Sequence, residues 1–121
     1  MEIPEIHQIL KSLLLEQVPP LRVKQATETN FEVTGTREAM QGRQKVDGFY
    51  FASLVPKPKD IRFYFFPLYT DPDAFELSAE LKKMLKGKTC FHIRKLDEAL
   101  IAEIREMIAK GVKIYAAKNL V

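Results

Sequence analysis

The sequence predicts a single α+β domain, in which an antiparallel sheet of about four to six strands packs with an N-terminal helix, short central helices and a long C-terminal helix. Apolar residues recur at three- and four-residue steps near both ends of the chain, which is typical of helices. Between these ends they alternate with polar residues, which is typical of strands. The 121 residues are 46% hydrophobic and 29% charged, so the chain can bury one core. We therefore expect one domain over residues 1–121.

The first predicted helix runs from Ile3 to Val18. Pro4 fits the first turn of a helix, and Pro19-Pro20 ends this one. Its apolar residues share one side, which faces the core: Ile3, Ile6, Leu10, Leu13, Leu14 and Val18.

Two strands are predicted between Leu21 and Gly35, where apolar and polar residues alternate around a Thr29-Asn30 turn. The next segment, Thr36 to Lys45, is polar and contains Gly42, so we predict a loop. Gly48 to Val55 and Asp60 to Leu68 then form a hairpin, because the two prolines between them cannot donate to a sheet ladder.

The C-terminal part predicts short helix starts at Asp71 and Ser78, whose side chains can cap a first turn. The segment Thr89 to Arg94 predicts a strand, with Phe91 and Ile93 on one face and Cys90, His92 and Arg94 on the other. A long helix follows from Asp97 to Tyr115, in which Gly111 is either a point of close packing or a break.

Three groups of residues resemble the YdhG-like family of small bacterial proteins, from about Val46 onward. They are the hairpin aromatics Phe49-Tyr50-Phe51 and Phe63-Tyr64-Phe65-Phe66, the strand Lys86-Gly87-Lys88-x-x-Phe91-x-Ile93, and the helix entry Leu96-Asp97-x-x-Leu100-Ile101. The resemblance implies an antiparallel sheet covered by helices in a cytoplasmic bacterial protein, and it carries over no catalytic residues. Some family members bear a frataxin-like iron-chaperone label that rests on likeness of fold.

The segment Lys82 to Lys95 holds six cationic side chains and one histidine without a carboxylate, so it marks the surface best suited to an anionic partner. The alternative interpretation is a solvated, lysine-rich surface. Gly87-Lys88-Thr89 resembles the end of a P-loop, but Lys82 stands at the position of its first glycine and a strand follows, which excludes that motif.

Our functional prediction is non-enzymatic binding without a cofactor. We expect a concave surface between the sheet and the Thr70 to Lys88 segment, and a small anionic ligand or an acidic segment of a partner protein bound there. The predicted binding residues are rings and cations: Tyr50, Tyr64, Tyr69, Lys86, Lys88, His92 and Arg94.

Single-stranded nucleic acid is an alternative partner. In the predicted hairpin, Tyr50, Arg62, Tyr64 and Phe66 share one face, and exposed tyrosines beside an arginine can stack unpaired bases. A sheet covered by helices on both faces explains the same rings without a ligand. No RNP-type motif accompanies them, so we rank nucleic acid below a small anion.

Metal and catalytic sites have weaker support. Asp71, Asp73 and Glu76 are the best candidates for a frataxin-like iron site, but helix capping also explains the two aspartates, and the net charge of +3 disfavours collecting cations. Cys90 and His92 are too few for a zinc site and stand side by side on one strand, so we interpret Cys90 as a buried thiol.

The expected location is the cytoplasm. Cys90 is the only cysteine, which suits a reducing compartment. The first residues are acidic and lead into an amphipathic pattern, unlike a secretory signal. No apolar run approaches the ~20 residues of a membrane span, so no membrane association is predicted.

Overall fold

The computed structural model describes residues 1–121 and confirms the predicted α+β fold. Its main sheet has six antiparallel strands in the order β1-β2-β5-β6-β8-β7. These strands are β1 (Arg22–Ala26), β2 (Phe31–Thr34), β5 (Tyr50–Pro56), β6 (Ile61–Phe65), β7 (Leu85–Lys86) and β8 (Cys90–Ile93). A separate hairpin pairs β3 (Ala39–Gln41) with β4 (Gln44–Val46).

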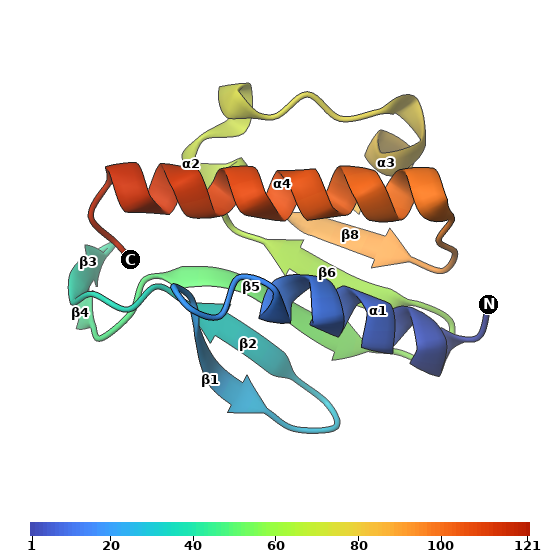
Figure 1. The fold of residues 1–121 in the computed structure, drawn as a ribbon, viewed down its shortest axis with the longest axis horizontal. Helices are drawn as coiled ribbons and strands as arrows, with labels where there is room; N and C mark the ends of the chain where they lie inside the picture. Colours follow the sequence, from blue (N-terminus) through green and yellow to red (C-terminus); the bar gives the residue numbers. More distant parts are fainter.

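Two long helices, α1 (Ile3–Leu15) and α4 (Glu98–Ala117), lie side by side over one face of the main sheet (Figure 1). The opposite face carries no helix, so the interpretation of a sheet covered on both faces is wrong. The physical reason is the strict alternation of β6 and β8, in which only every second side chain is buried. A sheet of that pattern has one face for the core and one for solvent.

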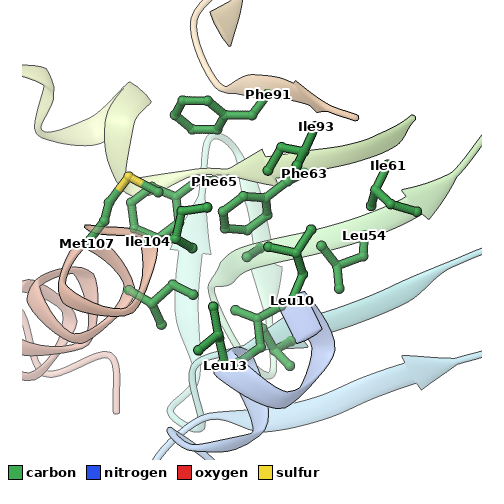
Figure 2. Close-up of a cluster of buried hydrophobic side chains, with 14 of the residues drawn as sticks. Leu10, Leu13, Leu54, Ile61, Phe63, Phe65, Phe91, Ile93, Ile104 and Met107 are labelled. Atoms are coloured by element: carbon green, nitrogen blue, oxygen red, sulfur yellow. The ribbon is translucent and has the colours of Figure 1, made fainter. Parts of the chain in front are cut away.

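The core fills the space between the two helices and the covered face (Figure 2). The Phe51 ring meets the rings of Phe65 and Tyr115 edge to face, with centroids 5.4 and 5.1 Å apart. The core residues labelled in Figure 2 come from both helices and from β5, β6 and β8: Leu10, Leu13, Leu54, Ile61, Phe63, Phe65, Phe91, Ile93, Ile104 and Met107.

Helix α4 is continuous, which identifies Gly111 as a point of close packing. A β-carbon at this position would stand 2.9 Å from Phe65 Cζ and 3.1 Å from the Phe51 ring. The glycine therefore lets α4 approach the sheet closely. As expected, Asp97 stands at the start of α4 as its N-cap, and its carboxylate accepts a 2.8 Å hydrogen bond from the backbone amide of Leu100.

The segment between β6 and β7 forms three short helices: α2 (Pro67–Thr70), the 3-10 helix η1 (Pro72–Ala74) and α3 (Ala79–Met84). Ser78 caps α3 by accepting a hydrogen bond from the Leu81 amide, as predicted, and its own hydroxyl donates to Glu103 of α4. Phe75 packs edge to face on Phe65, with centroids 5.4 Å apart. These contacts hold the segment against the end of the core.

Two local predictions are wrong. Residues 36–45 are not a loop, because residues 39–46 form the β3–β4 hairpin, in which Gly42 adopts a φ of 64° at the turn. The pattern of apolar and polar residues did not indicate these two strands, because each strand has only three residues and neither reaches the core. Asp71 makes no cap to η1, since its carboxylate contacts Lys118 instead. The chain has no helix whose length and hydropathy suit a membrane span.

Candidate anion-binding site

The strongest concentration of positive charge lies in a hollow of about 820 Å³ beside the edge of the main sheet. Lys86 of β7 and His92 of β8 point to the uncovered face, because they alternate with the core residues Leu85, Phe91 and Ile93. We call this site the cationic hollow. Its lining comes from α3, β7, β8 and the residues after β8: Ala79, Glu80, Lys83, Met84, Lys86, His92, Arg94 and Lys95.

Most of the charge in the cationic hollow is unpaired. Glu80 is its one carboxylate and lies 3.6 Å from Lys95 Nζ in an exposed pair. Lys83, Lys86 and Arg94 have no carboxylate within ion-pair distance. Three cations thus share one concave surface without a compensating charge, which creates a positive potential and favours an anionic occupant.

A buried carboxylate organises the sheet surface next to the hollow. Asp60 is only 4% exposed, and its Oδ1 accepts a 2.8 Å hydrogen bond from Arg62 Nε. Its Oδ2 lies 3.8 Å from His92 Nδ1, and His92 stands directly opposite Arg62 in the β6–β8 pairing. The hydrogen bond from Arg62 Nε to Asp60 raises the pKa of Arg62. It leaves both terminal nitrogens of the guanidinium without a protein partner. Arg62 can therefore donate to a ligand.

The centre of the uncovered face carries Tyr64, whose cross-strand neighbours are Ser53 on one side and Cys90 on the other. Both neighbours have small side chains, and Tyr64 is partly exposed between them. Burial raises the pKa of the Cys90 thiol, which keeps it protonated at neutral pH. Tyr50 lies further along the same face, where its hydroxyl bonds to Ser53 Oγ and burial raises its pKa to about 12.

The seven predicted binding residues do not share one hollow. Lys86, His92 and Arg94 line the cationic hollow, and Tyr64 stands on the sheet beside it. Tyr50 lines a separate small hollow between β2, β5 and the β3–β4 hairpin. Two further residues, Tyr69 and Lys88, line a larger hollow on the other side of the α3–β7 segment. The separation arises at β7, where Leu85 faces the larger hollow and Lys86 the cationic one.

The larger hollow has a mixed lining. Tyr69 is 55% exposed, and its ring stacks on Phe66 at 5.4 Å with an angle of 8° between the planes. The ammonium group of Lys88 lies 5.6 Å from the centre of the Tyr69 ring. Carboxylates and lysines occur together in the lining, with Asp73, Glu76, Lys82 and Lys88, so this hollow has no dominant charge.

The three carboxylates considered for iron are not arranged as a metal site. Asp71 Oδ2 lies 2.6 Å from Lys118 Nζ and accepts a 2.8 Å hydrogen bond from the Thr70 hydroxyl, which lowers the Asp71 pKa. Asp73 and Glu76 instead line the larger hollow. Nowhere in the chain do three or more acidic, histidine or cysteine side chains form a group that could hold a metal ion.

Sequence reasoning did not select two residues that the structure places at the site. Lys83 belongs to the basic segment, and the helical phase of α3 could have separated it from its neighbour Lys82. Asp60 gave no usable signal, because a polar residue ahead of a strand is ordinary and only the fold buries it.

Comparisons with family models, curated proteins and solved structures found no match to this chain. The resemblance to the YdhG-like family therefore stays a prediction. The functional argument consequently depends on the geometry and charge of the site itself.

Proposed function

We propose that the protein is a non-enzymatic binding module whose cationic hollow holds a multiply charged anionic group, supplied by a small ligand or by an acidic segment of a partner protein. The observation that carries this proposal is the convergence of Lys83, Lys86 and Arg94 on one hollow without a paired carboxylate. Two lysines and an arginine on one surface bind phosphate or carboxylate groups through charge-assisted hydrogen bonds.

Two further observations support binding without catalysis. A cysteine nucleophile acts as a thiolate, and burial of Cys90 raises its pKa instead of lowering it. His92 lies beside Asp60 on the strand that also carries Cys90, and successive residues on one strand face stand parallel without being aligned for proton transfer. We also propose a cytoplasmic location, because Cys90 has no second cysteine with which to form a disulfide.

The experiment is a thermal-shift and calorimetric titration with pyrophosphate, tripolyphosphate and a poly-glutamate peptide at low salt. Binding stabilises the native state and raises the melting temperature. K86E and R94E each place a carboxylate in the hollow, so we expect either substitution to reduce the affinity at least about tenfold, the loss of one strong charge-assisted contact.

The matched control is K113E, which makes the same change of charge at an exposed lysine of α4 outside the hollow. It should leave binding almost unchanged. The polyphosphates and the peptide distinguish a small ligand from an acidic segment. Absence of stabilisation by all three probes, or equal losses in K86E and K113E, would overturn the proposal.

A further inference from the structure

The uncovered face of the main sheet is larger than the cationic hollow and continuous with it. His92 belongs to both, since it lines the hollow and pairs across the strands with Arg62. Arg62 and Tyr64 occupy the same face of β6, and Tyr50 and Glu32 carry that face toward the opposite edge of the sheet. A ligand bound in the hollow can therefore extend onto the sheet.

A second group of cations lies at the far side of this face. Lys24 and Glu32 form a loose pair with 3.9 Å between Nζ and Oε2. Arg22, Lys24 and Lys45 together line a small hollow beside β1 and the β3–β4 hairpin, where Asp47 is the one acidic residue of the lining. Lys45 Nζ also lies 2.8 Å from Glu38 Oε1, so Arg22 and the loosely paired Lys24 are the cations left for a ligand there. Six strands at a spacing of about 4.8 Å put the two cationic edges about 24 Å apart. The face thus has unpaired cations at the cationic hollow, Arg22 and the loosely paired Lys24 at its other end, and a tyrosine in the middle.

From this arrangement we propose that the uncovered face binds single-stranded nucleic acid, with backbone phosphates at the two cationic edges and a base stacked on Tyr64. The inference rests on the proposed anion site, which supplies two of the phosphate contacts, those of Lys86 and Arg94. Tyr64 is suited to stacking because it is partly exposed and its two cross-strand neighbours, Ser53 and Cys90, have small side chains. Arg62 presents two unpaired terminal nitrogens next to it.

The same features favour unpaired nucleic acid over other polyanions. An acidic polypeptide would use the cations but gain nothing from a partly exposed tyrosine at the centre of the face. A duplex hides its bases from a flat sheet surface, whereas single strands expose them for stacking. Stacking on an aromatic side chain tolerates any base, so we expect little sequence preference.

The test is fluorescence anisotropy with labelled single strands of about 12 nucleotides, as oligo-U and oligo-dT, with a duplex of similar length as the comparison. Contacts from Lys24, Arg62, Lys86 and Arg94 to four phosphates predict that affinity falls about 50-fold between about 50 and 200 mM salt. We expect the duplex to bind more weakly than either single strand.

Substitutions at tyrosines separate stacking from charge. Y64L should weaken single-strand binding about 5- to 100-fold, whereas Y64F keeps the ring and should bind like the parent. Y69L is the matched control, because Tyr69 is an exposed ring that lies in the larger hollow, away from this face. K24E should also weaken binding and flatten the salt dependence. Circular dichroism of each variant checks that the fold is retained.

The outcomes distinguish this inference from the proposed function. If pyrophosphate stabilises the protein but single strands do not bind, the nucleic-acid inference is overturned and the anion site stands. If poly-glutamate competes as well as the oligonucleotides and Y64L binds them normally, the occupant is an acidic polypeptide and the inference is again overturned. If no polyanion binds, both fail.

Discussion

The two faces of the main sheet are built from the same strands but differ in burial and in the kind of side chain they carry. The four residues of β8 show this contrast. Phe91 and Ile93 are fully buried beneath the helices, whereas the side chain of His92 is 25% exposed on the other face. Burial of apolar surface accounts for the residues of the covered face. It does not account for an arginine, a histidine and a half-buried tyrosine on the uncovered face, where the proposed binding function would use them.

The two faces also treat charge differently. The core cluster consists of hydrophobic residues, while the single well-buried carboxylate, Asp60, lies where it can bond to Arg62 of the uncovered face. A buried carboxylate is tolerated only when it is paired. Asp60 thereby orients Arg62, although burying its charge is costly. This arrangement agrees with the binding function that we propose for the uncovered face.

The largest expected difference between the faces comes from two neighbouring residues of β8. F91A removes a ring from the core and should lower the free energy of unfolding by about 3 to 5 kcal/mol. H92A removes a partly exposed side chain that makes no hydrogen bond within the protein, and should change it by about 0.5 kcal/mol or less. Urea unfolding of both variants measures the difference. Equal losses would mean that both faces are packed, contrary to the structure.

The covered face was the more predictable of the two from sequence. The period of apolar residues located α1, α4 and the central hairpin, because burial imposes that period on helices and strands. The phase of β8 was also correct, with Phe91 and Ile93 toward the core. Gly111 could not be assigned from sequence, since only the distance to Phe51 and Phe65 shows whether a helical glycine is a break or a contact.

The uncovered face was less predictable. The basic segment indicated where cations gather, but not that β7 would separate Lys86 from Lys88 or that Tyr50 would lie two strands away from β8, which Arg94 follows. Which residues converge on one hollow depends on strand order and on the direction of α3, and these are set by the whole core. The β3–β4 hairpin was missed for a related reason, because it contributes no apolar face of its own.

An intermediate effect is expected at the closest contact of the covered face. G111L extends a side chain into the Phe51 and Phe65 rings, and overpacking of this kind costs up to about 3 kcal/mol. Replacing a glycine within a helix by a better helix former stabilises the helix by about 1 kcal/mol, so we expect a net loss of about 2 kcal/mol in the free energy of unfolding. A102L, at an exposed position of α4, is the control and should not destabilise the protein. A G111L variant as stable as A102L would show that α4 lies further from the sheet.

The smallest effect that we predict concerns the two histidines, one associated with each face. His7 lies on α1 with its Nε2 buried and without a hydrogen-bond partner, and burial, with a smaller effect of the Lys11 charge, lowers its pKa below 6.5. The native state therefore binds the His7 proton less readily than the unfolded chain. The resulting stability is complete above the unfolded pKa and is lost as the pH falls from 6.5 through the lower native pKa.

Urea unfolding at about pH 8 and about pH 5.5 should accordingly show a lower midpoint at the acidic pH. This interval lies above the range in which Asp71 titrates, because its pKa is lowered from 3.8, so that carboxylate does not contribute. In the H7Q variant, the part of the pH dependence of stability that comes from His7 should disappear. The H92Q variant, which removes the only other histidine, should keep that dependence. The reverse result would place the protonation-sensitive histidine on the uncovered face, where a change of charge would alter anion binding instead of packing.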